Sequence, residues 1–189
     1  MKYAFIGGIP TAGKSRLAKI VARKLGIAHF ETDGWRKEFR SDPEMRAWVD
    51  FFRNQNEEKY WRETDCAAHW KNIECQSEAL WPAMLEKIRA IQTSGAPAIF
   101  EGVNILPRLA GRGLGFPGIY LLGESFELVF ARNRKNPRWG NTEALQFKEA
   151  RAFWDCERPR YEAEARQYGF KTFSDSALAE RELFSLLRA

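Results

Sequence analysis

Short apolar runs alternate with amphipathic stretches along this chain of 189 residues. Residues 3–6 form an apolar run that stops at two glycines, which is typical of a buried strand ending in a turn. Residues 14–25 repeat apolar side chains at helical spacing and close on a glycine, which predicts a helix. The same patterns predict strands at 27–33, 96–102, 116–123 and 170–173.

Helical patterns fill the spaces between these strands. The stretch 35–93 is helical in character and rich in tryptophan, and further helices are predicted at 124–135, 141–168 and 176–187. Asn136 and Pro137 interrupt the pattern between two of them. Strands that alternate with amphipathic helices indicate an α/β fold, in which helices cover both faces of a five-stranded parallel sheet. We expect residues 1–189 to form a single domain.

Composition narrows the class of protein. Hydrophobic residues make up 44% and charged residues 29%, which excludes collagen, low-complexity disorder and coiled coil. The 30 Lys and Arg exceed the 25 Asp and Glu by five, which suits an anionic ligand but falls short of a dedicated nucleic-acid binder. Cys66, Cys75 and Cys156 lack metal-ligand spacing, so we expect three reduced thiols, with Cys66 and Cys75 as buried packing residues. No apolar run has membrane-spanning length, and we expect a cytoplasmic protein without membrane partners.

Residues 8–15 match the phosphate-loop pattern G-x-x-x-x-G-K-[ST] between an expected strand and an expected helix. Backbone N–H groups of such a loop point at a phosphate, and the helix adds the positive end of its dipole. The lysine neutralises the β and γ oxygens and the serine hydroxyl can coordinate Mg²⁺. The predicted nucleotide-binding residues are Gly8, Ile9, Pro10, Thr11, Ala12, Gly13, Lys14, Ser15 and Leu17.

No N-K-x-D guanine-reading motif is present, and the chain resembles the small P-loop kinases of the nucleoside and metabolite group. These include enzymes similar to shikimate kinase, polynucleotide kinase, chloramphenicol phosphotransferase, zeta toxin and 2-phosphoglycerate kinase. The resemblance implies a three-layer P-loop NTPase fold that uses ATP and Mg²⁺. It also implies a helical acceptor-binding insertion at about 35–93 and a helical lid at about 124–168. Many relatives have glycine where this loop has Thr11 or Ala12, so the backbone here lacks the freedom of glycine.

Two carboxylates, Glu31 and Asp33, end the second expected strand and should share one face of it. In shikimate-kinase-like enzymes, the first residue of such a pair holds Mg²⁺ through water and the second meets the acceptor hydroxyl. Polynucleotide kinase has Asp-x-x-Arg here, and this chain has Asp33 followed by Arg36. The resemblance makes Asp33 a candidate general base and Arg36 a clamp for an anionic substrate. Alternatively, Asp33 only caps the following helix.

Glu101 and Gly102 end the third expected strand. A carboxylate at this place corresponds to a Walker-B-type residue, and the sequence after it looks like that of 2-phosphoglycerate-kinase-like chains. We predict that Ser15, Glu31 and Glu101 serve the metal and that Glu101 and Gly102 meet the substrate. Alternatively, Glu101 is a solvated strand end and Gly102 serves the turn. Whether Asp33 or Glu101 takes the acceptor proton stays open.

Arginines flank the break at Asn136 and Pro137. Guanidinium groups bind phosphoryl oxygens bidentately, so we predict catalytic roles for Arg132, Arg134 and Arg138, with Arg151 next. Acidic residues are also frequent in this segment. Alternatively, therefore, each arginine only forms an ion pair on the surface and does not contact a phosphoryl group. The aromatic side chains of 35–93, such as Trp48, either line an acceptor pocket or pack in the core.

These features predict ATP-dependent transfer of a phosphoryl group to a hydroxyl or phosphate of a small molecule. One alternative is a kinase for polynucleotide 5′-hydroxyl groups, so nucleic acid is a possible but less favoured partner. Another is a regulatory ATP-binding module without acceptor chemistry. The sequence allows a monomer or a homodimer.

Overall fold

The computed structural model describes residues 1–188, and a five-stranded parallel sheet lies at its centre. The strands pair in the order β2-β3-β1-β4-β5, and every pair is parallel. Because Glu101 pairs with both Ile6 and Glu31, three strands end together at one edge of the sheet. The strands are β1 (Tyr3–Gly8), β2 (Ala28–Glu31), β3 (Ala98–Glu101), β4 (Gly118–Leu121) and β5 (Lys171–Phe173).

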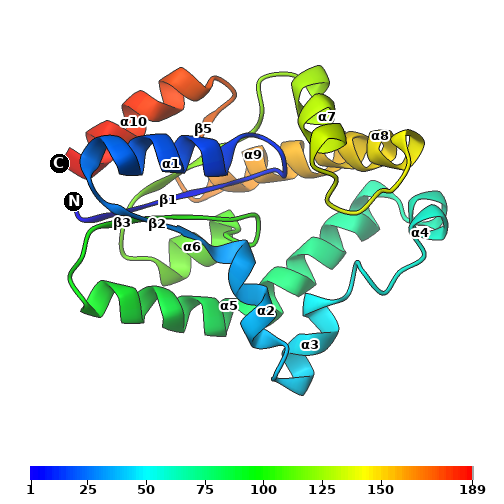
Figure 1. Cartoon of the computed structure of the whole chain (residues 1–189), viewed down its shortest axis with the longest axis horizontal. Coiled ribbons are helices and arrows are strands. Elements are labelled where there is room, and N and C mark those ends of the chain that lie inside the picture. Colours follow the sequence, from blue (N-terminus) through cyan, green and yellow to red (C-terminus); the bar gives the residue numbers. More distant parts are fainter. Residues whose placement is uncertain (189) are drawn as a thin grey trace.

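Helices cover both faces of this sheet (Figure 1). Helices α1 (Lys14–Leu25) and α10 (Ser176–Arg188) pack against each other on one face. On the other face, α6 (Pro107–Gly113) contacts both α5 (Cys66–Thr93) and α9 (Arg158–Gln167). The apolar residues of strands and helices form one continuous core. The predicted three-layer α/β architecture is confirmed.

The remaining helices gather beyond the edge at which the strands end (Figure 1). The stretch after β2 forms a 3₁₀ turn η1 (Thr32–Trp35) and helices α2 (Arg36–Phe39), α3 (Pro43–Val49) and α4 (Glu57–Glu63) before α5. The stretch after β4 forms α7 (Phe126–Lys135), α8 (Glu143–Arg151) and a π-helical segment η2 (Ala152–Glu157). Contacts of α4 with α8 and of α5 with η2 join the two stretches.

Three local features differ from the sequence predictions. Strand β2 ends at Glu31, so Asp33 lies in η1 and not on a strand. Helix α6 was not predicted. The predicted helix 141–168 begins at Glu143 and contains the π-helical segment just before Pro159. Proline has no N–H to donate to the carbonyl four residues earlier, here that of Asp155, so the backbone widens at this point.

The expectation of three reduced thiols is wrong. Cys66 at the start of α5 and Cys156 in η2 form a disulfide, with their Cα atoms 4.9 Å apart although the two residues are 90 positions apart in sequence. Cys75 is free, and Cys66 is exposed rather than buried. The packing of α5 against η2 creates this proximity, which cysteine spacing alone does not encode. The cytoplasmic location predicted partly from reduced thiols loses that support.

Within residues 1–188, no helix combines the length and the apolar character that crossing a bilayer requires.

Candidate active site

The phosphate loop connects β1 to α1 with a backbone that glycine makes possible. Gly8 has φ of 119°, and a Cβ there would lie 2.1 Å from the carbonyl oxygen of Leu121, so only glycine fits. Thr11 adopts φ of 55°, a left-handed conformation without glycine. Its hydroxyl donates to the carbonyl of Val129 at 3.2 Å. The loop therefore holds its shape at Thr11 through a contact with α7.

Lys14 lies inside this loop and is only 6% exposed. Its Nζ donates to the carbonyls of Gly8 at 2.9 Å and Ile9 at 2.7 Å. Burial lowers the pKa of the Lys14 amine to about 8, although the negative charges of Glu101 and Asp33 act in the opposite direction. A buried amine that meets only neutral carbonyls is suited to bind an anion in the loop.

A cavity opens over the phosphate loop and brings together side chains from separate parts of the chain. Its walls come from the loop itself, the ends of β2 and β3, the turn η1, and the segment from α7 to α8. Most of the charged residues predicted for the site lie here together with Ser15, namely Lys14, Glu31, Asp33, Glu101, Arg132 and Arg138.

Asp33 is half-buried at the floor of this cavity. Its Oδ1 accepts the backbone N–H of Val103 at 3.1 Å, and its carboxylate pairs with Arg36 at 3.3 Å and Arg138 at 3.9 Å. Burial alone would raise the pKa of the Asp33 carboxyl, but the charges of Arg36, Arg138 and Lys14, with the Val103 N–H, hold that pKa below its usual value. Asp33 caps no helix, so the capping alternative is wrong.

Gly102 determines how closely the turn η1 approaches the end of β3. A Cβ at Gly102 would lie 2.1 Å from Oγ1 of Thr32 and 2.9 Å from Oδ1 of Asp33. The Thr32 hydroxyl donates to the carbonyl of Glu101 at 3.1 Å, which fixes the same junction. The absent side chain of Gly102 therefore makes room for Asp33.

Glu101 is the most buried carboxylate in the cavity, at 2% exposure. Within the described residues, its Oε1 has no hydrogen-bond partner, and Nε2 of His29 lies 3.6 Å away. Ser15 and Glu31 line the same space. No group of three His, Cys, Asp or Glu residues within 1–188 forms a protein-only metal site. One or two carboxylates and a hydroxyl beside a phosphate site fit Mg²⁺, which keeps waters and phosphate oxygens as its other ligands.

The predicted arginines separate into two groups. Arg132 donates from Nη1 to the carbonyl of Ala12 at 2.9 Å and so lies against the phosphate loop, while Arg138 faces Asp33. Arg134 is exposed and pairs with Glu143 at 3.2 Å, and Arg151 pairs with Asp155 at 2.8 Å. Neither Arg134 nor Arg151 lines the cavity over the loop. Arg134 and Arg151 therefore form surface ion pairs, which was the alternative to a catalytic role.

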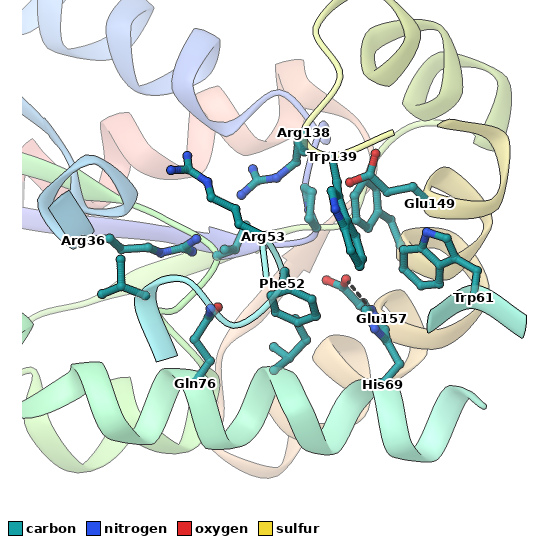
Figure 2. Close-up of a pocket in the computed structure, with 15 residues that line it drawn as sticks. Arg36, Phe52, Arg53, Trp61, His69, Gln76, Arg138, Trp139, Glu149 and Glu157 are labelled. Carbon is teal, nitrogen blue, oxygen red and sulfur yellow. Dashed lines mark hydrogen bonds and ion pairs between the residues drawn. The ribbon is translucent and has the colours of Figure 1, made fainter. Parts of the chain in front are cut away.

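A second cavity begins where the first one ends, because Arg138 lines both (Figure 2). Helices α2 to α5 form one side, and α8, η2 and the segment before α8 form the other. The aromatic residues of 35–93 divide between the core and this cavity. Trp70 and Trp81 are buried in the core, whereas Phe52 and Trp61 line the second cavity and Trp48 does not. That this cavity binds an acceptor stays a prediction.

Several residues of the second cavity were not predicted, among them His69, Trp139, Glu149 and Glu157. Both ring nitrogens of His69 form hydrogen bonds. Nδ1 lies 2.8 Å from the Tyr60 hydroxyl, and Nε2 lies 3.1 Å from Oε1 of Glu157. Pro159 was the only sequence signal near Glu157, since proline within a helical pattern marks an irregular turn. Irregular π-helical turns frequently occur at functional sites.

Asn104 was also missed. Its Oδ1 accepts a hydrogen bond from Arg36, and its Nδ2 donates to the Ser77 hydroxyl at 2.8 Å. Asn104 is buried, so it holds Arg36 in place between α5 and the end of β3.

The sequence matches no family model and no curated protein. The fold is similar to that of several solved structures. Shikimate kinase from Acinetobacter baumannii in complex with shikimate has a TM-score of 0.56 and 16% identity, covering 100% of this chain and 94% of that chain. TT1252 from Thermus thermophilus has the same TM-score and identity, covering 98% and 95%. A putative kinase from Chloroflexus aurantiacus has a TM-score of 0.50 and 14% identity, covering 98% and 95%. The predicted P-loop kinase fold is confirmed.

Proposed function

We propose that this protein transfers the γ-phosphoryl group of ATP to a hydroxyl group of a small molecule. The observation that carries the proposal is the junction of two cavities at Asp33 and Arg138. One cavity contains the phosphate loop and the other contains space for an organic molecule. A group bound in the second cavity would therefore meet the end of a nucleotide bound in the first.

The transfer forms a bond between the acceptor oxygen and the γ-phosphorus and breaks the bond from that phosphorus to the bridging oxygen, so that ADP leaves. Lys14 would move from the loop carbonyls to the γ-phosphate oxygens. Arg132 and Arg138 would bind the charge that develops on those oxygens. When bound, Mg²⁺ would neutralise phosphate charge, and Ser15, Glu31 and Glu101 would hold it directly or through water.

Asp33 would orient the acceptor hydroxyl and accept its proton. A carboxyl whose pKa is held below its usual value is a weak base, so it gives little help to early proton removal. A loose phosphoryl-transfer transition state needs little early proton removal, and positioning then contributes more to the rate. The low pKa of Asp33 therefore agrees with a residue that holds the acceptor in line and takes the proton late.

The second cavity supports a small acceptor better than a nucleic-acid end. Its far wall carries the buried carboxylates Glu149 and Glu157, which would repel a phosphate that reached them, and its arginines lie at the end beside Asp33 (Figure 2). The nucleotide base would leave the phosphate loop on the opposite side, where Arg132, Leu17 and Ala177 line a separate hollow between α1 and α10.

The test is a panel of hydroxylated acceptors incubated with ATP and Mg²⁺, with ADP release and phosphorylated product measured by mass. We expect at least one acceptor to accelerate ATP consumption and to gain one phosphoryl group. The Lys14→Ala variant serves as the inactive control. If every acceptor leaves only the same slow hydrolysis, the protein is a regulatory nucleotide-binding module rather than a kinase.

A further inference from the structure

The far end of the second cavity carries negative charge, whereas the end beside Asp33 carries positive charge. Figure 2 shows Arg36, Arg53 and Arg138 on one side of the cavity and Glu149 and Glu157 on the other. Both carboxylates are almost fully buried, at 3% and 1% exposure. A ligand that fills this cavity therefore meets opposite charges at its two ends.

Each of the two carboxylates has one hydrogen-bond partner within residues 1–188. Glu149 Oε2 accepts from Nδ2 of Asn133 at 2.8 Å, and Glu157 Oε1 lies 3.1 Å from Nε2 of His69. Within residues 1–188, no Lys or Arg forms an ion pair with Glu149 or Glu157. A buried carboxylate that no Lys or Arg balances is costly to ionise, so a ligand cation that pairs with it contributes substantially to the free energy of binding.

The cost of ionising a buried carboxylate appears in the pKa of Glu149. Burial raises the pKa of the Glu149 carboxyl to about 7, although the hydrogen bond from Asn133 and the charge of Arg138 lower it. The nearby carboxylates Glu57 and Glu157 act in the same direction as burial. A positively charged or hydrogen-bond-donating ligand group would stabilise the ionised form of Glu149.

Aromatic rings form the walls beside these carboxylates. The rings of Trp61 and Trp139 have centroids 5.7 Å apart at an interplanar angle of 56°, and the Phe52 ring lies 6.1 Å from that of Trp139. All three residues line the cavity. Aromatic faces attract cations and stack on flat rings, so they complement an amino group or an amino-substituted ring.

We propose that the acceptor is a hydroxylated small molecule that carries an amino group at the end opposite its reacting hydroxyl. Glu149 and Glu157 bind this amino group, and Trp61 and Trp139 form the walls around it. The proposal rests on the proposed function, because it takes the Asp33 end of the cavity as the place of the reacting hydroxyl. The amino group belongs either to an aliphatic ammonium, as in an amino sugar, or to an amino-substituted ring, as in a nucleoside.

Matched acceptor pairs test the proposal. Glucosamine with glucose represents the aliphatic ammonium, and cytidine with uridine and adenosine with inosine represent the ring amino group. Each probe is assayed for phosphorylation with ATP and Mg²⁺. Each is also assayed for binding through the fluorescence of the tryptophans, without nucleotide. We expect the amino member of at least one pair to be preferred by about tenfold or more in both assays.

The carboxylates are tested by Glu149→Gln and Glu157→Gln. We expect each to lose about tenfold in affinity for the preferred amino probe and little for its amino-free partner. Glu143→Gln, on the exposed side of α8, is the matched control and should behave like the unmodified protein. Trp61→Leu removes a wall without changing a buried charge and should weaken the amino probe about fivefold. This variant keeps the test valid if a glutamine variant folds poorly.

The outcomes separate this proposal from the proposed function. Amino probes that bind through Glu149 and Glu157 but are never phosphorylated would contradict the kinase activity and support the amino-binding site. Phosphorylation of amino-free partners as good as that of the amino probes would overturn the amino-binding site and keep the kinase. A preference that the glutamine variants leave unchanged would also overturn it, and so would the absence of binding by every amino probe.

Discussion

The phosphate loop and the second cavity are built in different ways. Residues 8–15 are consecutive, and their backbone shape follows from Gly8, Gly13 and one left-handed residue, Thr11. The second cavity draws its walls from α2 to α5 and from the segment leading through α8 into η2. In the proposed function, a phosphate, which is the same in every nucleotide, would thus be bound by a local motif, whereas a particular acceptor would be bound by surfaces that only long-range packing brings together.

The two regions also arrange their charges differently. Over the loop, the cations Lys14, Arg132 and Arg138 share one space with three carboxylates. In the second cavity, the arginines lie at the end beside Asp33, and Glu149 and Glu157 lie at the far end (Figure 2). Asp33 lies where the two regions meet. Variants that change one region and leave the other intact can therefore test whether the phosphate loop and the second cavity have separate roles.

The largest effect is expected at the loop. Lys14→Ala removes the charge that would follow the γ-phosphate, and we expect turnover to fall by a factor on the order of 10²–10³. Binding of acceptor alone should not change. Lys19→Ala, an exposed position on α1, is the control in steady-state assays of product formation. Near-normal turnover in Lys14→Ala would refute the assignment of the phosphate loop.

Asp33→Asn tests the place where the phosphate loop and the second cavity meet. The substitution keeps shape and removes the negative charge, so we expect kcat to fall by about 10² while ATP and Mg²⁺ bind within a few-fold of normal. Glu101→Gln should instead raise the Mg²⁺ concentration needed for half-maximal rate. Kinetics at varied Mg²⁺ measure both effects. The reverse pattern would mean that the two carboxylates have exchanged roles.

The disulfide should stabilise the second cavity and not the loop, because Cys66 and Cys156 join α5 to η2. We expect Cys66→Ser to lower the free energy of unfolding by about 2 kcal/mol or more in the oxidised protein. Denaturant unfolding measures this, and Cys75→Ser is the control. Under a reducing agent the difference should vanish. Three free thiols in the non-reduced protein would contradict the bond.

Gly102→Ala tests the placement of Asp33 without touching its charge. The added Cβ would collide with Thr32 Oγ1, so η1 must shift and we expect kcat to fall about tenfold with a loss of about 1–3 kcal/mol in stability. Gly115→Ala is the control, since a Cβ there meets no atom within 4 Å. Unchanged kinetics would show that the approach of η1 to β3 does not set the position of Asp33.

The smallest effect concerns pH and rests on the proposed amino acceptor. With the pKa of Glu149 at about 7, raising the pH from 6 to 8 ionises this carboxyl and should lower the KM for an amino acceptor several-fold. The groups around it are Asn133, Arg138, Glu57 and Glu157. Because the folded pKa lies above its usual value of 4.5, the contribution of Glu149 to stability falls as the pH rises from about 4.5 to about 7 and then levels off. Glu149→Gln should flatten the dependence of both KM and stability on pH. If the variant and the unmodified protein show the same pH dependence, Glu149 is not the titrating group.

The sequence alone determined the sheet, most helices and the phosphate loop. Each depends on short-range patterns, such as the apolar run before Gly7 or the helical spacing between Lys14 and Leu25. Asp33, Glu101 and Arg138 were also predicted for the site, since strand ends and a break beside Pro137 are visible in the order of residues. Their roles stay predictions.

Only the tertiary structure decided which side chains share the second cavity. Glu157 faces it from the π-helical segment η2, and Trp139 and Trp61 meet although 78 positions separate them. The disulfide from Cys66 to Cys156 follows from the same packing. A residue pattern records spacing along one element, whereas contacts between distant elements depend on how their apolar faces pack, so they appear only once the chain has folded.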